Sequence, residues 1–228
     1  VRKCKGAGIS TVMITGDHVS TAKAIAQQLG ISGNRDKVIS GEELSQMSDD
    51  ELYQVVNRVS VYARVAPEHK LRIVKQLQRR GHIAAVTGDG VNDAPALKAA
   101  DIGIAMGITG TEVSKEAADM VLADDNFASI VGAVEEGRHV WKNLQKAILY
   151  TLPTNGGQAL LVIGAILAAP FIPLFALGLP LAPIQILWIN LFDSVFLTLP
   201  LMMEPKEKRL LESPPRDPKE KIASRLFF

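Results

Sequence analysis

The hydrophobic positions of this chain follow two patterns, one before and one after residue 146. In the first part, short apolar runs alternate with segments that carry apolar residues at helical spacing. The strand-like runs are Thr11–Ile14, Val59–Ala63, His82–Val86, Ile102–Met106 and Met120–Ala123. Strands that alternate with helices predict a parallel sheet covered on both faces. Residues 1–140 are therefore expected to form an α/β Rossmann-like domain.

Helix boundaries in this domain are marked by residue types that are common at the ends of helices. Ser48 and Glu51 have capping-box spacing, which predicts the start of a helix. Pro67 opens a further helix over 68–80, and Gly81 closes it. A helical run over 20–29 stops at Gly30 in the same way.

The second part is almost entirely apolar. Between 147 and 203 the only charged residue is Asp193. The stretches 147–169 and 182–203 each have the roughly 20 residues that a helix needs to cross a bilayer. The Pro-rich segment 170–181 between them predicts a short extracytoplasmic turn. We therefore expect a transmembrane helical hairpin within 141–203, and an integral, multi-pass membrane protein.

One predicted helix belongs to both parts. Helical periodicity continues from Phe127 to Ala169 without a stop signal. About 40 helical residues make a rod of roughly 60 Å, longer than a bilayer core. Such a rod would connect the α/β domain to the membrane. Pro153 lies within it, and we expect tilting or bending near this residue to transmit a signal.

Charge and composition limit the partners. The 25 Lys and Arg and 24 Asp and Glu give a formal net charge of +1, so no nucleic-acid partner is expected. Cys4 is the only cysteine, which excludes an internal disulfide, and the His residues lack metal-ligand spacing. The Lys and Arg of 204–228 predict a cytoplasmic loop, followed by the start of a further transmembrane helix. The α/β domain would lie on that cytoplasmic side.

Candidate chemistry is concentrated in the eleven residues 87–97, Thr-Gly-Asp-Gly-Val-Asn-Asp-Ala-Pro-Ala-Leu. They follow a predicted strand, and the carboxyl ends of strands in α/β sheets are where ligands bind. Asp89 and Asp93 supply hard oxygen ligands of the kind that hold Mg²⁺ against a phosphate. A capped strand-to-helix turn would account for a bare Gly-Asp-Gly, but the whole segment favours a site.

Two other motifs have the residue types of a phosphate site. Thr15-Gly16-Asp17 ends the first strand, where a hydroxyl and a backbone N–H can hold a phosphoryl oxygen. A helix N-cap is the alternative interpretation of this triplet. Lys70 lies near the start of a helix, where a fixed cation can stabilise phosphoryl charge. The alternative for Lys70 is an ordinary solvated surface residue.

Polar side chains interrupt both apolar stretches. They are Asn155 and Gln158 in the first, and Asn190, Asp193 and Ser194 in the second. Polar groups are costly in a membrane and mark ion or substrate paths. Helical spacing places Asp193 and Ser194 on either side of the face defined by Asn190. We therefore expect a cation site, with helix packing through Gly156 and Gly157 as the alternative.

Together these motifs resemble those of P-type ATPases, the phosphorylated ion pumps of the haloacid-dehalogenase-like superfamily, and specifically the type II, calcium-pump-like group. The resemblance implies that Asp89 binds Mg²⁺, that Asn92 contacts the phosphate and that Asp93 supports the site. It also implies roles for the octapeptide Ala63–Lys70. There Arg64 would contact nucleotide and Lys70 would offset phosphate charge, while Thr15, Gly16 and Asp17 would contact nucleotide as well.

Two positions differ from many calcium pumps. This chain has Gln158 where they have Glu, and Asp193-Ser194 where they have Thr-Asp. The two helices thus offer one carboxylate instead of two, which argues against transport of two Ca²⁺. A single Ca²⁺, Na⁺, K⁺ or H⁺ remains open.

The expected function is ATP-driven cation transport through an aspartyl-phosphate intermediate, with Ca²⁺ favoured and with ATP and Mg²⁺ as cofactors. The nucleophile motif Asp-Lys-Thr-Gly-Thr does not occur here, so the chain is expected to be a fragment that is inactive alone. Its partners would be ATP, the cation, the lipid bilayer and the remaining domains of the polypeptide. The alternatives are a pump for a monovalent cation, a membrane-tethered phosphatase of the same superfamily, or a non-catalytic remnant.

Overall fold

The computed structural model describes residues 1–33, 36–178 and 180–217, which form two compact units. Unit 1 is built mainly from Val1–Ala133 and unit 2 mainly from Val134–Leu210. The predicted start of a further transmembrane helix falls on 218–228, outside the described residues. The long helix α8 (Phe127–Ala168) contributes residues to both units.

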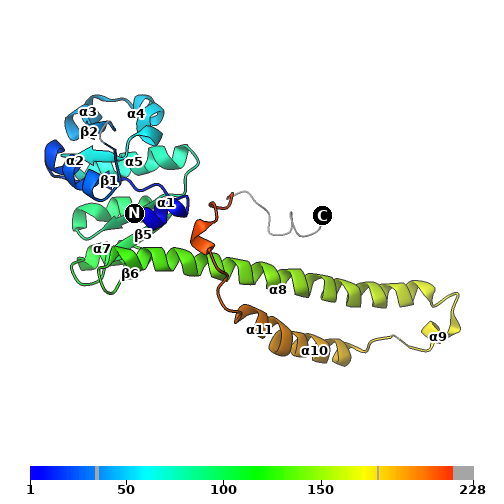
Figure 1. The fold of residues 1–228 in the computed structure, drawn as a ribbon. Coiled ribbons are helices and arrows are strands. Elements are labelled where there is room, and N and C mark those ends of the chain that lie inside the picture. The colour runs from blue at the N-terminus through cyan, green and yellow to red at the C-terminus, as the bar shows by residue number, and fades with distance from the viewer. Residues whose placement is uncertain (34–35, 179, 218–228) are drawn as a thin grey trace. The chain divides into compact units, whose positions relative to one another are not determined.

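Unit 1 alternates strands and helices, as the hydrophobic pattern predicts (Figure 1). Its elements before α8 are α1 (Arg2–Gly6), β1 (Met13–Ile14), α2 (Val19–Gln28), β2 (Val38–Ser40), α3 (Gly41–Gln46), α4 (Asp49–Val55), β3 (Val61–Ala63), α5 (Pro67–Arg79), β4 (Ala85–Gly88), α6 (Ala94–Ala99), β5 (Ile102–Met106), α7 (Glu112–Ala117) and β6 (Met120–Leu122). Short 3-10 turns cover Val56–Arg58 and Val91–Asp93.

The strands form two three-stranded parallel sheets, in the orders β1-β3-β2 and β4-β5-β6. The first sheet is covered on both faces. Tyr62 of β3 packs in the core cluster that α3, α4 and α5 share, whereas Val61 and Ala63 pack with Ala22 and Ala26 of α2. Alternate residues of a strand point to opposite faces, so β3 is buried from both sides. The α/β class is therefore confirmed.

Two strands differ from the sequence prediction. The predicted strand His82–Val86 is instead β4, Ala85–Gly88. His82 is used to end α5, because its N–H donates to the Leu77 carbonyl (3.2 Å). Strand β2 was not predicted, since its residues Val38–Ser40 are too few to show an alternating pattern and Ser40 also serves as the N-cap of α3.

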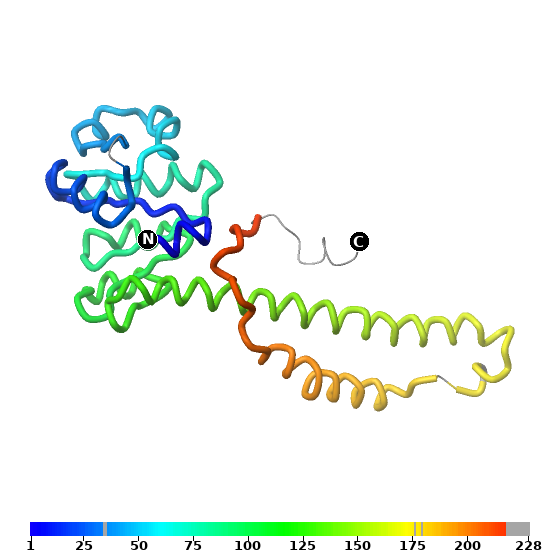
Figure 2. The backbone as a smooth tube through the Cα atoms, viewed as in Figure 1, coloured from blue at the N-terminus to red at the C-terminus, as the bar shows by residue number. Residues whose placement is uncertain are grey.

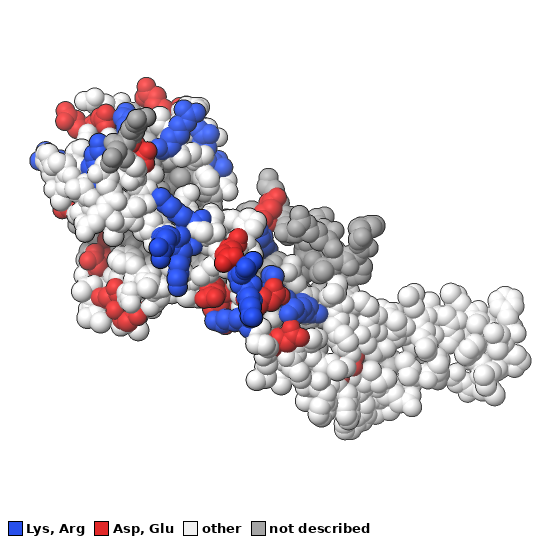
Figure 3. Space-filling model, in the orientation of Figure 1, with Lys and Arg blue, Asp and Glu red and all other residues white. Residues whose placement is uncertain are grey.

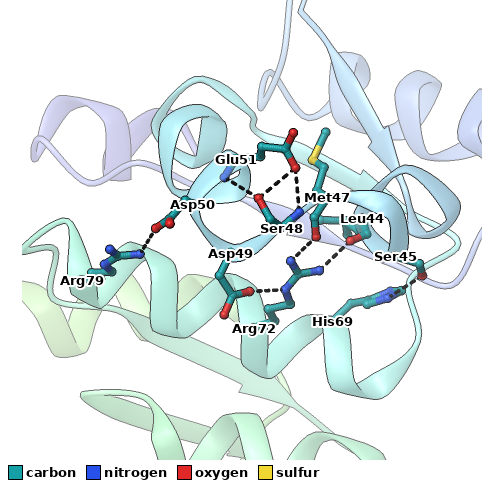
Figure 4. Close-up of polar contacts among 10 residues, drawn as sticks. All are labelled: Leu44, Ser45, Met47, Ser48, Asp49, Asp50, Glu51, His69, Arg72 and Arg79. Carbon is teal, nitrogen blue, oxygen red and sulfur yellow. Dashed lines mark hydrogen bonds and ion pairs between the residues drawn. The ribbon is translucent and has the colours of Figure 1, made fainter.

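Helix α5 is fixed to α3 and α4 by polar contacts along one side (Figure 4). The guanidinium of Arg72 donates to the carbonyls of Leu44 (2.6 Å) and Met47 and to the carboxylate of Asp49 (2.5 Å). His69 accepts from the Ala66 N–H (3.1 Å) at one ring nitrogen and contacts the Ser45 hydroxyl (3.1 Å) with the other. These contacts hold the first turns of α5, where Lys70 lies.

Unit 2 is a helical hairpin (Figures 1 and 2). It contains most of α8, then α9 (Pro173–Ala176), α10 (Pro183–Phe192), a π-helical segment η3 (Asp193–Thr198) and α11 (Leu199–Met202). Among the described residues, two helices contain an 18-residue stretch apolar enough to cross a membrane. Its mean hydropathy is 1.3 within Phe127–Ala168 and 1.5 within Pro183–Met202. On the drawn face, Lys, Arg, Asp and Glu gather at one end of the hairpin, and the rest of it is almost free of them (Figure 3).

A cluster of ion pairs joins α8 to the segment after α11. Its members, called here the stalk cluster, are Glu136, Lys142, Lys146, Glu204, Lys206 and Glu207. Lys142 pairs with Glu207, Lys146 with Glu204 (2.5 Å), and Lys206 with Glu136. Lys142 holds the pKa of Glu207 below its ordinary value, and Glu136 raises the pKa of Lys206. The end of α11 is attached to α8 as well, because buried Asn143 donates to the Met202 carbonyl (2.9 Å).

Candidate functional site

The carboxylate of Asp93 organises the loop that follows β4. Asp93 is 5% exposed and accepts from the backbone N–H groups of Asp89 (3.2 Å) and Gly90 (3.4 Å) with one oxygen. Its other oxygen is paired with the ammonium of Lys70. A buried charge is costly unless it is paired and hydrogen-bonded, and these three donors meet that need. Asp93 therefore fixes the loop backbone and brings Lys70 beside it.

Gly88 makes this arrangement possible. A Cβ on Gly88 would lie 2.5 Å from the Asp93 Cβ and 2.8 Å from its Oδ2, which is closer than side chains can approach. A Cβ on Gly90 would meet nothing closer than 3.9 Å. Only the first of these two glycines is therefore required for space.

Asp89 and Asn92 have exposed side chains at the carboxyl end of β4. Among the described residues, the Asp89 carboxylate has no hydrogen-bond or ion-pair partner, and no group of three His, Cys, Asp or Glu side chains could hold a metal. Mg²⁺ in phosphate sites commonly takes only one or two carboxylates, with phosphate oxygens and waters as its other ligands. One free carboxylate beside a fixed cation fits such an ion.

The Thr15-Gly16-Asp17 triplet follows β1 and lies against Arg64, which follows β3. The Thr15 hydroxyl donates to the Asp17 carboxylate (2.9 Å) and accepts from the Asp17 N–H (3.1 Å). The Arg64 N–H donates to the Asp17 carbonyl (3.0 Å). Arg64 has a φ of 51°, and a Cβ on Gly41 would lie 2.0 Å from its carbonyl oxygen. The structure thus groups Arg64 with the triplet and groups Lys70 with Asp93, and no described hydrogen bond links the two groups.

The hairpin holds side-chain atoms that are buried without a hydrogen-bond partner. Among the described residues these are Nε2 of Gln158, Oδ1 of Asn190 and Oγ1 of Thr198. The Ser194 hydroxyl is instead bonded to the Asn190 carbonyl (2.8 Å), and Asn155 is exposed. Buried polar groups normally have a hydrogen-bond partner. These three unpaired atoms are therefore candidate contacts for a bound ion or another polar group.

Comparisons with known proteins cover both parts of the chain. A haloacid dehalogenase-like hydrolase model matches residues 1–101, a second model of that description matches 69–134, and "Cation transporting ATPase, C-terminus" matches 178–228. The chain is 51% identical over 225 residues to the calcium-transporting ATPase of Bacillus subtilis, covering 99% of this chain and 24% of that relative. The chain belongs to the P-type cation-transporting ATPases.

Other P-type ATPase relatives show the same coverage. Identity is 50% to the cation-transporting ATPase pma1 of Synechocystis sp. and 51% to the probable cation-transporting ATPase F of Mycobacterium tuberculosis, each with 24% of the relative covered. The chain thus spans about a quarter of the length of these relatives. A solved structure of the catalytic domain of the CPx-ATPase CopB-B is 28% identical and covers 58% of this chain and 41% of that one, with a TM-score of 0.42.

One residue of this P-type ATPase chain was missed by sequence reasoning. The hydroxyls of Thr151, Thr154 and Ser194 each donate to the carbonyl four residues earlier. The equivalent carbonyl for Thr198 is that of Ser194, which already accepts from the Leu199 N–H, five residues later, in the π-helical segment. Thr198 is left unpaired, and π-helical turns often occur at functional sites. No periodicity in the sequence marks such a turn.

Proposed function

We propose that this chain is part of an ATP-driven cation pump that works through an aspartyl-phosphate intermediate. The main observation in support of this proposal is that α8 is one continuous helix from Phe127 to Ala168. Four residues separate its start from β6 of the α/β unit, and it contains Gln158, whose Nε2 is buried without a partner among the described residues. One element thus runs from the α/β unit, which contains the phosphate-type residues, to a polar position in an apolar hairpin.

Each residue of the proposed phosphate and nucleotide site is assigned its own role. Asp89 would hold Mg²⁺, which when bound neutralises charge on the transferring phosphoryl group. Lys70 would supply the fixed cation beside that group, and Asp93 orients Lys70 and the loop. Asn92 would contact the phosphate, and Thr15, Gly16, Asp17 and Arg64 would contact the nucleotide. The nucleophilic Asp would be supplied by another part of the polypeptide.

In the hairpin, the transported cation would bind near Asn190, Asp193 and Gln158, with Asn155 and Ser194 as further ligands. A charged carboxylate in a membrane helix is costly, and a bound cation offsets that cost. Ca²⁺ is favoured because the relative from Bacillus subtilis is named a calcium-transporting ATPase. A monovalent cation is the second candidate, since Asp193 is the only carboxylate between 147 and 203.

The proposed location follows from the same elements. The hairpin would cross the membrane twice, with the α/β unit and the stalk cluster on the cytoplasmic side. The Lys and Arg near both ends of the hairpin support this orientation.

The test uses the full-length protein in membranes. Acid-stable phosphoenzyme formed from labelled ATP is measured while Ca²⁺, Na⁺, K⁺ and pH are varied in turn. We expect phosphorylation that depends on micromolar Ca²⁺ and is lost in Asp193→Asn, while Thr151→Val, whose hydroxyl is already bonded within α8, retains it. Phosphorylation driven by a monovalent cation would assign the pump to the second candidate. Phosphatase activity without any cation dependence would contradict the proposal.

A further inference from the structure

The connection between β6 and α8 has three polar side chains. Two of them bind the start of α8, and the third binds the loop after β5. Asp124 accepts from the Asn126 N–H (3.1 Å) and the Ser129 hydroxyl (2.7 Å), and Asn126 accepts from the Ala128 N–H (2.9 Å). These contacts cap the first turn of α8. Asp125, between them, accepts nothing from α8 and points to the loop after β5.

The carboxylate of Asp125 binds that loop with all of its acceptor capacity. It accepts from the N–H groups of Gly107 (2.6 Å), Ile108 (3.0 Å) and Thr109 (2.7 Å), and from the Thr109 hydroxyl (2.8 Å). The backbone of Asp125 has a φ of 49°, a conformation uncommon outside glycine. Donors on the charged form, that of Ile108 foremost, lower the pKa of Asp125 to about 2.

Two glycines of this loop lie against strand backbone. A Cβ on Gly107 would lie 2.5 Å from the Leu122 carbonyl oxygen, and one on Gly110 would lie 1.9 Å from that of Met106. The loop is therefore packed at these two positions on the ends of β5 and β6. We expect this packing, with the bonds to Asp125, to fix the path of the backbone toward residue 111.

The far end of the loop reaches the proposed Mg²⁺ residue. The Thr111 N–H donates to the carbonyl of Asp89 (2.8 Å), and the hydroxyl of Ser114 lies 3.1 Å from the same carbonyl. Ser114 is completely buried, and its hydroxyl is shared with the Thr111 carbonyl (2.7 Å). The Asp89 backbone is thus held at its carbonyl by this loop and at its N–H by Asp93.

We propose that Asp125 and Ser114 are positioning residues for the carboxylate of Asp89. Asp125 acts through the loop 107–111, and Ser114 acts through its hydroxyl at the Asp89 carbonyl. The inference rests on the proposed function, because it takes Asp89 as the Mg²⁺ ligand. Groups that orient a metal ligand without touching the metal commonly contribute about 10–100-fold to metal affinity. Asp125 also directly precedes the capped first turn of α8, so the same loop links the Mg²⁺ site to the membrane helix.

The test measures metal binding directly in the full-length protein. Mn²⁺, which also prefers oxygen ligands, serves as the probe in the presence of inorganic phosphate, and free Mn²⁺ is followed by electron paramagnetic resonance. We expect Asp125→Asn and Ser114→Ala each to weaken Mn²⁺ binding about tenfold or more. Asp124→Asn, which alters only the cap of α8, is the matched control and is expected to bind Mn²⁺ as tightly as the unchanged protein.

Two comparisons separate this inference from the proposed function. Unchanged Mn²⁺ binding in Asp89→Asn would overturn the assignment of Mg²⁺ to Asp89 and the inference with it. Weakened binding in Asp89→Asn, with unchanged binding in Asp125→Asn and Ser114→Ala, would overturn only the inference. An equal loss in Asp124→Asn would also overturn it, because the effect would then come from the start of α8 in general. Ser114 lies in α7 and bonds to Asp89 and Thr111, so Ser114→Ala tests the inference even where Asp125→Asn folds poorly.

Discussion

At the scale of single residues, the loop after β4 depends on one close approach. Asp93 reaches its three donors only because Gly88 has no side chain in its path. Asp89, by contrast, makes no described side-chain contact and is free to bind a ligand. Support of the loop and the proposed binding of Mg²⁺ are thus divided between two carboxylates four residues apart.

Gly88→Ala should therefore be far more damaging than Gly90→Ala. The new methyl group would displace Asp93 and with it Lys70, and a misplacement of about 1 Å can cost on the order of a hundredfold in rate. Phosphoenzyme formation in the full-length protein measures the effect. Gly90→Ala, with no neighbour closer than 3.9 Å, is the control, and equal rates in the two variants would contradict this account of the loop.

Asp125 should contribute to acid stability. Its pKa falls from an ordinary 3.8 to about 2 in the folded protein, so its stabilisation is fully present above about pH 4. It is lost as the pH falls through about 2. The difference in thermal midpoint between the unchanged protein and Asp125→Asn should shrink over that interval. A difference that stays constant from neutral pH down to the acid limit would show that the charge of Asp125 is not responsible.

At the scale of elements, the sequence predicts what depends on local pattern. The capping box at Ser48, the start of α5 at Pro67 and the positive φ of Gly81 all follow from side-chain chemistry next to the helix end. The course of α8 through Pro153 also follows, because its apolar spacing continues without a break. Contacts between segments that are far apart in sequence cannot be predicted in this way. Nothing local predicts that Asp125 binds residues 107–109, since this depends on tertiary packing. No pattern in the sequence marks the π-helical turn in which Thr198 lacks a partner.

The unpaired hydroxyl of Thr198 leads to a prediction about the cation. Thr198→Val keeps the shape of the side chain and removes the hydroxyl. If the hydroxyl contacts the cation pathway, the half-saturating cation concentration for phosphorylation should rise about three- to tenfold, the range of typical polar contacts in membranes. Thr154→Val is the control because its hydroxyl is bonded to the Tyr150 carbonyl (2.9 Å). The same value in both variants would remove Thr198 from the site.

Pro153 provides a test of how α8 transmits a signal. Proline has no N–H to donate to the carbonyl four residues earlier, so it weakens α8 locally although the helix continues. Pro153→Ala restores that donor, and we expect less cation transported per ATP hydrolysed. Vesicle transport and ATPase assays on the same preparation measure the ratio. An unchanged ratio would exclude a role for bending at Pro153.

At the scale of the whole molecule, α8 is the element that both units share, and the stalk cluster attaches a second segment to it. The pairs of the cluster are partly exposed, so each alone is weak and sensitive to salt. Their number and the buried Asn143 are what keep the segment after α11 beside α8.

Removing two cations of the cluster should therefore loosen that segment. For the double variant Lys142→Gln with Lys146→Gln, we expect transport per ATP to fall roughly twofold at low salt, with a smaller effect at high salt because screening already weakens the pairs. Lys115→Gln, which breaks an ion pair with Glu112 inside unit 1, is the control. The prediction fails if both variants lower the ratio equally, or if the effect does not depend on salt.

The stalk cluster also has a consequence for how the protein is made. Lys146 and Glu204 are 58 residues apart in sequence, and Lys142 and Glu207 are 65 apart. At about 5–20 residues per second, several seconds of synthesis separate the two lysines from the carboxylates that pair with them. In the proposed orientation, both lysines are during that interval unpaired positive charges beside the first apolar stretch, the signal that retains a flank in the cytoplasm. The later arrival of Glu204 and Glu207 would then turn a topology signal used during insertion into a structural contact of the finished protein.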